Sequence, residues 1–517
     1  MNMRSTGILL SITSLPSKYG IGCFSKAAYD FVDWLADAGQ TYWQILPLGP
    51  TSYGDSPYQT FSTIAGNPYL ISLEDLIEEG VLTAGECDAV DFGTDPERVD
   101  YGKMSENRLK LLRKAYERSN ISENPAYQQF VAENQDWLPD HALFMALKGR
   151  FNNASWTEWP EDIRLRWGFA MDYYRRELYF EIEFQQYLQF VFFSQWQKLK
   201  AYANGKNIKI IGDIPIYVSQ DGVDRWTHAE LFQVDEKNNL SAVAGCPPDS
   251  FSADGQIWGN PLYRWDYHRA TGFDWWIQRL YHTFRLYDAV RLDHFRGFDE
   301  YFSVPYGAKS ALTGHWEKGP GMDLFNTLRY RLGEKELIVE DLGLMTDSVR
   351  QLVKDSGFPN MKVLQFAFDL TDVGAANDYL PHNYDRNCVV YTGTHDNETI
   401  AGWLDRLTDQ EMKQVRDYIC DHHTPADRLY WRIIAEAMKS SANICIIPAQ
   451  DYLGLDNNAR MNMPGTVDAN WSWRLLPGQV TDELAEEVLI VTKRFGRANW
   501  DALNRMEKAK KQAESAK

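Results

Sequence analysis

The sequence has few of the residues that hold metals or build disulfide frameworks. Its six cysteines show no CxxC spacing, and its ten histidines include no HExxH motif. His422 and His423 are adjacent in the chain, so their rings would splay apart on a helix. Scattered thiols of this kind are typical of reduced cysteines, which favours a cytoplasmic protein and argues against a structural zinc site.

Long hydrophobic runs and clustered positive charge are also missing. The longest apolar stretch near the start, 7–12, is far shorter than the roughly 20 residues of a membrane span and too short for a signal peptide. The net charge is −19 at pH 7, with no stripe of lysine and arginine that could neutralise phosphates. We therefore expect neither a membrane nor a nucleic acid as a partner.

The motifs of nucleotide-binding folds are absent as well. No GxGxxG or GxxxxGKS/T motif follows an expected strand, so the chain lacks the phosphate-binding loop of dinucleotide-binding and P-loop proteins. No repeat with a period of 20–50 residues is visible. What remains is a chain of 517 residues, 44% of them hydrophobic, which is long enough for a barrel with insertions.

Four short apolar runs each lead to an acidic residue. The runs lie at 208–214, 289–293, 337–340 and 388–396, and the acids are Asp213, Asp293, Glu340 and Asp396. Four unrelated ion pairs explain this pattern poorly. Parallel strands whose carboxyl ends open on one shared face explain it directly, because catalytic groups of barrel enzymes lie at those ends.

Eight segments have the apolar character of buried strands, and helical patterns separate most of them. They lie at 7–13, 41–48, 208–214, from 289 onward, 337–340, 361–368, 388–393 and 444–448. This alternation predicts an α/β protein whose residues 1–517 form a single catalytic (β/α)8 TIM barrel.

Two insertions interrupt the expected barrel. The segment 73–205, after the second strand, is predicted to form a mainly helical subdomain, with Trp156, Trp159 and Trp167 as packing residues. The segment 217–270, after the third strand, is long and poor in strand signals, and is predicted to form a loop subdomain. Its glycine- and proline-rich part, 245–261, is expected to act as a lid, and the alternative is a plain insert.

The acids at the strand ends can be assigned roles on physical grounds. Arg291 and Asp293 point to the same face of a strand, and the guanidinium offsets the desolvation of the carboxylate, so Asp293 stays ionised. A fixed, ionised carboxylate suits a covalent nucleophile, and the alternative is a structural ion pair that caps the strand. Glu340 follows three apolar residues and faces other acids, which should raise its pKa and suit it to general acid/base catalysis.

Two further acids have alternative interpretations. Asp396 lies among Thr394, His395 and Asn397, a polar setting that suits it to hold sugar hydroxyls and stabilise positive charge, and the alternative is a loop cap. Asp213 fits a hydrogen-bond hub at the strand end as well as it fits direct contact with a sugar. Several acids without a set of metal-binding histidines point to glycosyl chemistry, which uses a pair of carboxyl groups.

Several segments resemble the signature regions of the α-amylase clan. The finer details are similar to one branch, the 4-α-glucanotransferases of glycoside hydrolase family 77, called amylomaltase or disproportionating enzyme. The matching segments are WQILPLGPTSYGDSPYQ (43–59), GDIPIYV (212–218), PPDSFSADGQIWGNP (247–261), VRLDHFRG (290–297), VEDLG (339–343), THDN (394–397) and RMNMPGT (460–466). The first expected strand starts at residue 7, so the chain resembles the short form of the family, which lacks an extra amino-terminal domain.

The resemblance implies an activity and a site. The activity is transfer of α-1,4-glucan segments between glucans or maltooligosaccharides in maltodextrin, glycogen or starch metabolism, with no metal or organic cofactor. Asp293 is implied as the nucleophile, Glu340 as the general acid/base and Asp396 as the transition-state stabiliser, in agreement with the assignments made from the residues. The implied sugar contacts are Tyr58, Asp213, Trp258, Asn260, Arg291, His294 and His395. A flexible lid at 247–256 is implied as well.

Two other functions fit parts of this pattern. An α-amylase-clan hydrolase would use the same three carboxylates with water as the acceptor. A non-catalytic barrel that only binds glucan is expected to have lost at least one of the three, and all are present. Transfer and hydrolysis differ in the second half of the reaction, so the products formed from maltotriose separate them.

Overall fold

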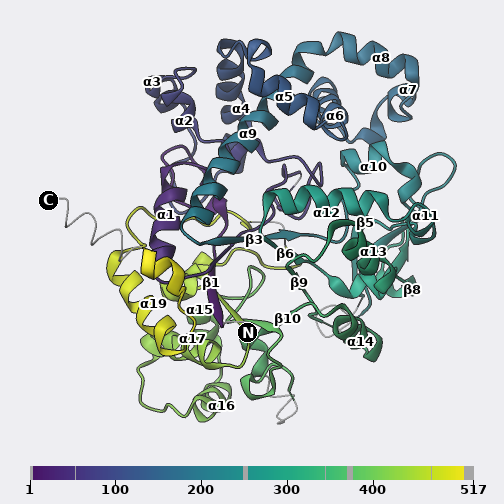
Figure 1. The fold of residues 1–517 in the computed structure, drawn as a ribbon. Helices are drawn as coiled ribbons and strands as arrows, with labels where there is room; N and C mark the ends of the chain where they lie inside the picture. The colour runs from purple at the N-terminus through teal and green to yellow at the C-terminus, as the bar shows by residue number, and fades with distance from the viewer. Residues whose placement is uncertain are drawn as a thin grey trace.

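The structure is a computed structural model that describes residues 4–52, 54–248, 254–343, 345–368, 377–466 and 469–505. A barrel lies at its centre, and a group of helices covers one side of the barrel (Figure 1). A smaller sheet lies beside the barrel, in the part of the chain coloured teal and green. No helix of the described residues is long and apolar enough to cross a membrane.

Eight parallel strands of the described chain close into a barrel, which confirms the fold class predicted from the sequence. Each strand overlaps one of the eight expected segments, and the strands follow one another around the barrel in chain order. They are β1 (Ser5–Leu9), β2 (Tyr42–Gln44), β3 (Lys209–Ile214), β6 (Ala289–Leu292), β9 (Leu337–Val339), β10 (Asn360–Val363), β11 (Cys388–Tyr391) and β12 (Ile444–Pro448). The ring closes where β1 pairs with β12.

Some observed strands are shorter than expected because the chain turns into short 3-10 helices at the barrel mouth. β1 is followed by one at Ile12–Ser14, and β10 is followed by one at Leu364–Ala367. Ile12 and Leu364 are buried like strand residues, so the hydrophobic signal continues past the point where pairing stops.

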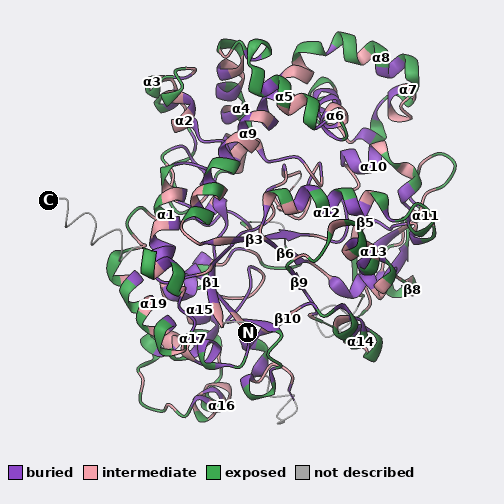
Figure 2. Cartoon of the chain, in the orientation of Figure 1, coloured by how far each residue is buried: buried purple, intermediate pink, exposed green. Residues whose placement is uncertain are grey.

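Most barrel strands are buried on both faces, which is why their sequences are largely continuous apolar runs. β10 is an exception, because Asn360 and Lys362 alternate with buried residues and are only half-buried. Figure 2 shows this burial in the central strands and exposure on the outer faces of the surrounding helices. The helices around the barrel are α1 (Lys26–Asp37), α12 (Asp274–Leu286), α13 (Met322–Leu332), α14 (Asp347–Ser356), α15 (Ile400–Arg406), α16 (Asp409–Ile419), α17 (Leu429–Lys439), α18 (Ala449–Tyr452) and α19 (Asp482–Arg494). The indole of Trp34 on α1 donates to the carbonyl of Thr481, which ties α1 to the start of α19.

The chain between β2 and β3 is helical in its described residues. Its helices are α2 (Leu73–Glu78), α3 (Ala84–Asp88), α4 (Tyr101–Arg118), α5 (Pro125–Glu133), α6 (Leu138–Arg150), α7 (Glu161–Arg164), α8 (Gly168–Glu177) and α9 (Tyr179–Gly205). Trp156 and Trp159 are buried in a cluster within this region, as expected. Trp167 is not a core residue, because 45% of it is exposed at the start of α8.

The segment 217–270 is not as poor in strands as its sequence suggests. It contains α10 (Val223–Thr227), β4 (Ala242–Cys246), β5 (Gln256–Pro261) and α11 (Trp265–Ala270). With β7 (Glu300–Pro305) and β8 (His315–Lys318), the two strands form an antiparallel sheet of order β5-β4-β7-β8 in the described residues.

The sequence of 217–270 does not show these strands because part of their pairing is with a strand outside the segment. β4 and β5 contain glycine and proline, which weaken the local strand signal. β4 pairs with β5 inside the segment, but its second partner, β7, comes only after the chain has passed through β6. Gly245 is needed for this pairing, because a Cβ there would lie 2.4 Å from the carbonyl oxygen of Gln256. The expected lid 247–256 follows β4, and its central residues, 249–253, lie outside the described residues.

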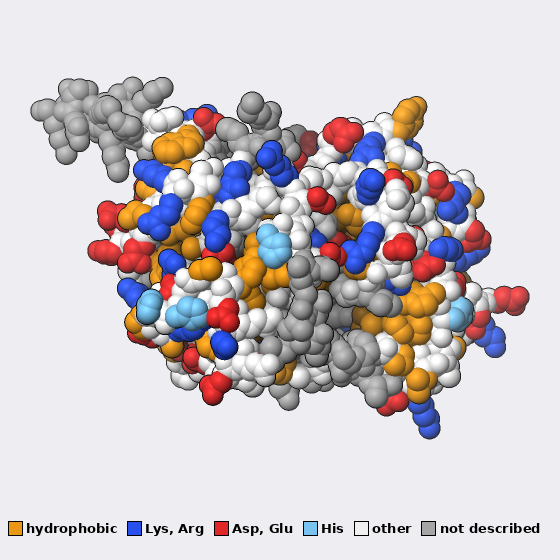
Figure 3. All heavy atoms as spheres, turned by 90° about the horizontal axis from the view of Figure 1, so that it is seen from below, with side chains coloured by type: hydrophobic (Ala, Val, Ile, Leu, Met, Phe, Trp, Pro, Cys, Tyr) orange, Lys and Arg blue, Asp and Glu red, His pale blue; other side chains and the backbone are white. Residues whose placement is uncertain are grey.

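Charges of both signs are mixed on one face of the molecule. On the face shown in Figure 3, lysine and arginine side chains are interspersed with aspartate and glutamate side chains. The described residues on this face show no continuous stripe of lysine and arginine.

Candidate active site

Neighbouring strands bring the predicted acids together at the carboxyl end of the barrel. Leu292 of β6 pairs with Val339 of β9. Asp293 and Glu340 each follow one of these paired residues, so they stand side by side at the mouth of the barrel. Asp213 lies across from Arg291 in the pairing of β3 with β6.

Arg291 is the buried centre of a charge network. Its Nη1 lies 2.8 Å from Asp213 Oδ2 and 2.9 Å from Asp293 Oδ1. Arg291 and Asp293 thus share one face of the chain, as their spacing predicts. A guanidinium between two carboxylates offsets the desolvation of all three groups, which would be costly to bury singly.

Asp213 is the fully buried member of this network and bonds both Arg291 and Tyr58. None of its side chain is exposed, and its carboxylate accepts hydrogen bonds from Arg291 and from the hydroxyl of Tyr58, the latter at 2.8 Å. Burial is the main cause that raises the pKa of Asp213. By contrast, 29% of the Asp293 side chain is exposed. This geometry favours the hydrogen-bond hub over direct sugar contact for Asp213.

Glu340 has the environment of a proton donor. Burial, and then the negative charge of Asp293, raise its pKa to about 7, as the sequence predicts. Its Oε2 accepts the main-chain N–H of His294 at 2.7 Å, and its Oε1 accepts that of Leu342 at 2.9 Å. These two bonds fix the carboxyl group at the end of β9.

A left-handed turn directs one of these bonds toward Glu340. His294 has φ 51°, a conformation uncommon for a residue with a side chain, and it begins the turn that follows Asp293. Burial lowers the pKa of its ring to about 4, so the imidazole is neutral. The ring packs edge-on against Trp258, with 5.0 Å between ring centroids.

Asp396 is more exposed than the other three acids of the site. Its side chain is 42% exposed, and its Oδ1 accepts a hydrogen bond from Asn462 Nδ2 at 2.6 Å. Burial alone would raise the pKa of Asp396, but the charge of His395, 3.4 Å away, and the Asn462 bond bring it below its ordinary value. The carboxylate is therefore ionised at neutral pH and faces the barrel mouth.

Aromatic rings line the mouth beside Asp396. Tyr58 stacks on His395 with 5.1 Å between centroids and an interplanar angle of 22°, and Trp471 packs against both rings. Asp396 also raises the pKa of His395 against the opposing effect of burial. Asn260 lies on β5 and donates to the carbonyl of Val218 at 2.9 Å, which joins the smaller sheet to the loop after β3.

Sequence reasoning missed three residues of this site: Arg460, Asn462 and Trp471. Arg460 donates to the main-chain carbonyl of Asp396 at 2.6 Å and to that of Asn462 at 2.8 Å. Arg460 and Asn462 belong to the RMNMPGT segment, one of the segments that resemble the family. No local sequence pattern links this segment to Asp396, which lies more than 60 residues earlier.

The comparisons with known proteins agree on one family. A family model described as 4-alpha-glucanotransferase matches residues 10–480. A 4-alpha-glucanotransferase from Clostridium butyricum is 46% identical over 490 residues, 94% of this chain and 100% of that protein. A chloroplastic/amyloplastic 4-alpha-glucanotransferase from Solanum tuberosum is 41% identical over 94% of this chain and 84% of its own length.

The solved structures agree with this assignment. An amylomaltase from Streptococcus agalactiae in complex with acarbose is 40% identical and superimposes with a TM-score of 0.92, over 96% of this chain and 100% of that one. The fold is shared with an amylomaltase from Corynebacterium glutamicum, at 19% identity and a TM-score of 0.76, over 96% of this chain and 75% of that one. From its barrel, its strand-end carboxylates and these similarities, the chain belongs to the 4-alpha-glucanotransferase family.

Proposed function

We propose that this chain moves segments of α-1,4-glucan from one glucan or maltooligosaccharide to another by a retaining double displacement. Asp293 is the nucleophile, Glu340 the general acid/base and Asp396 the stabiliser of positive charge. The observation that supports this most strongly is the pairing of Leu292 with Val339, because it sets Asp293 beside a buried carboxyl group whose pKa is raised to about 7.

The first displacement cleaves the donor. Glu340 gives its proton to the glycosidic oxygen, the bond from that oxygen to C1 breaks, and an oxygen of Asp293 bonds to C1. The leaving glucan departs with a free 4-hydroxyl. Asp396, ionised and open to the mouth, stabilises the oxocarbenium character that develops at C1.

The second displacement uses the same groups in reverse. Glu340, now a carboxylate, takes the proton of an acceptor 4-hydroxyl as that oxygen attacks C1, and the bond to Asp293 breaks. Two inversions retain the α configuration. Retention requires carboxyl groups roughly 5–5.5 Å apart, a separation that adjacent strand ends can supply.

The rings of the mouth are proposed sugar contacts. Tyr58, His395, Trp258 and His294 present flat faces or polar ring atoms near the carboxylates, and aromatic faces stack on sugar rings. Arg291 and Asp213, which are buried beneath, contribute by holding Asp293 and Tyr58 in position.

Maltotriose distinguishes transfer from hydrolysis. Transfer of a maltosyl unit between two maltotriose molecules gives glucose and maltopentaose, with no net gain in reducing ends. Hydrolysis raises the number of reducing ends with every turnover. We expect glucose and longer oligosaccharides in equal early amounts, measured by chromatography beside a reducing-end assay. A rise in reducing ends that keeps pace with donor consumption would favour the α-amylase-clan alternative.

The pKa of Glu340 sets the alkaline limit of activity. Glu340 must be protonated in the free enzyme to act as an acid, and its pKa is raised to about 7. As pH rises through that value the acid form is lost, so kcat/KM should fall about tenfold per pH unit above it. A profile measured from about pH 5 to about pH 9 tests this, and a constant kcat/KM across the alkaline half would contradict it.

The compartment is also a proposal. Cys23, Cys87, Cys388 and Cys445 are buried free thiols, which is typical of a reducing environment. The cytoplasm is therefore the proposed location, with α-1,4-glucans and maltooligosaccharides as donors and acceptors.

A further inference from the structure

A buried carboxylate holds both ends of the loop that carries His395 and Asp396. Asp451 lies on α18, directly after β12. Its Oδ2 accepts a hydrogen bond from Thr392 Oγ1 at 2.6 Å, and its Oδ1 accepts the main-chain N–H of Ile400 at 2.8 Å. Thr392 follows β11 and Ile400 begins α15, so this one side chain joins the two ends of the loop 393–399.

We propose that Asp451 is a positioning residue for Asp396: by joining the ends of the loop 393–399, it sets where the Asp396 carboxylate stands in the barrel mouth. The inference rests on the proposed role of Asp396 as the stabiliser of the transition state. Asp451 does not touch the reacting atoms and acts through the backbone of the loop.

The loop is internally braced, so fixing its ends fixes its position. Asn397 Oδ1 accepts both the main-chain N–H and the hydroxyl of Thr394, each at 2.9 Å. The N–H of Asp396 donates to the same hydroxyl at 3.2 Å. Gln365 holds the carbonyl of Glu398 at 2.8 Å. A braced loop moves as a unit, and a shift at either end is passed to Asp396.

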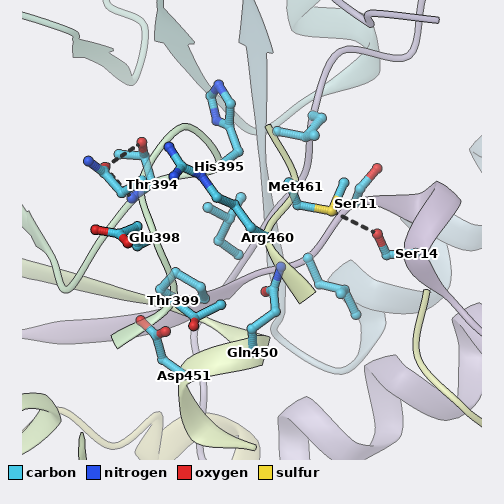
Figure 4. Close-up of a pocket in the computed structure, with 15 residues that line it drawn as sticks. Ser11, Ser14, Thr394, His395, Glu398, Thr399, Gln450, Asp451, Arg460 and Met461 are labelled. Atoms are coloured by element: carbon cyan, nitrogen blue, oxygen red, sulfur yellow. Dashed lines mark hydrogen bonds between the residues drawn. The ribbon is translucent and has the colours of Figure 1, made fainter. Parts of the chain in front are cut away.

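The burial of Asp451 supports a role for its carboxyl group in linking the two ends of the loop. Asp451, Thr392 and Ile400 have no exposed surface, and burial raises the pKa of Asp451 to about 7. A carboxyl group is costly to keep in such a place, and both of its oxygens are given to the ends of this loop. In the view of Figure 4, Asp451 and Thr399 lie at one end of a pocket and His395 at the other, so the carboxylate acts at a distance from the mouth.

Asp451→Ala removes both links and is the main test. We expect kcat on maltotriose to fall about tenfold to a hundredfold, because a displacement of about 1 Å in a positioned group has effects of that size. KM should change by less than about threefold, since Asp396 acts most strongly in the transition state. Turnover is expressed per folded molecule, with folding measured by circular dichroism.

Two conservative variants show whether the links matter. In Asp451→Asn, the amide oxygen can accept from Ile400 while the amide nitrogen donates to Thr392 Oγ1, so activity should stay within about threefold of the parent. Thr392→Val deletes only the hydroxyl link at nearly constant volume and should give an intermediate loss of kcat. If Asp451→Ala does not fold, Thr392→Val compared with the parent decides the question.

Asp224 offers a matched control. It is also buried, and it accepts a hydroxyl bond from Thr63 at 2.8 Å and a main-chain bond from the same residue at 2.9 Å. It therefore makes the same pair of bonds, to a segment other than the loop 393–399. Asp224→Ala should lower thermal stability by a similar amount and leave kcat unchanged.

The results separate this inference from the function on which it rests. If Asp396→Ala retains the turnover of the parent, the proposed role of Asp396 fails. If Asp396→Ala is inactive while Asp451→Ala and Thr392→Val keep the parent kcat, the positioning role alone fails. A loss in Asp451→Ala no larger than that in Asp224→Ala, or no recovery in Asp451→Asn, also overturns it.

Discussion

Replacing Asp293 with alanine should reduce transfer between maltooligosaccharides by a factor on the order of 10⁴ or more, because loss of a covalent nucleophile removes the intermediate itself. Neither of the two acids beside it is placed to substitute for it. Asp213 is fully buried, and Glu340 is held by two main-chain N–H groups. Initial rates with maltotriose as donor and acceptor measure the effect.

The fold should survive this change. Arg291 keeps its contact with Asp213 at 2.8 Å, so the guanidinium is not left without a partner in the interior. Asp288→Ala is the matched control, because Asp288 lies just before β6, at the opposite end of the same strand, where it accepts the N–H of Ile210. That variant should keep the parent kcat, whereas turnover in Asp293→Ala within tenfold of the parent would sink the assignment of the nucleophile.

Replacing Glu340 with alanine should lower kcat on glucans by about 10²- to 10⁴-fold, the usual contribution of a positioned acid/base. The loss should depend on the leaving group. α-Maltosyl fluoride needs no proton to release fluoride, so its first displacement should be nearly normal and the second should limit the rate. The measurement compares initial rates of fluoride release with those of transfer from maltotriose.

Azide tests the role of Glu340 more sharply. Azide needs no general base, and it fits the space that the shortened side chain leaves. Adding it to Glu340→Ala with α-maltosyl fluoride should restore turnover and give α-maltosyl azide, with retained configuration. Recovery without any azide product, or a β product, would show that Glu340 does not activate the acceptor of a retaining reaction.

The barrel and the acids of the site could be predicted from sequence because both depend on local signals. Each barrel strand is an apolar run of its own, and Asp293 and Glu340 follow such runs directly. Arg291 and Asp293 are two residues apart, and this spacing predicts that their side chains lie on the same face of a strand. The raised pKa of Glu340 could be predicted because three apolar residues precede it and other acids were expected nearby.

The parts that could not be predicted depend on pairings between distant segments. β4 pairs with β5 inside 217–270, but its other partner, β7, lies outside that segment, so the segment alone does not show that β4 lies within a larger sheet. The hydrogen bonds that Asn462 donates to Asp396 and that Thr392 donates to Asp451 span 66 and 59 residues. Such contacts are set by how the barrel closes, so a single sequence read along its length does not reveal them.

The central claim is that a glucan segment is held covalently on Asp293 while Glu340 exchanges the leaving group for an acceptor. Glu340→Ala treated with α-maltosyl fluoride, without azide, should accumulate this intermediate, because its second displacement is slow. Digestion at low pH followed by mass spectrometry should find one maltosyl unit on the peptide that contains Asp293. An adduct on another residue, or no adduct while fluoride is released at a measurable rate, would contradict the account.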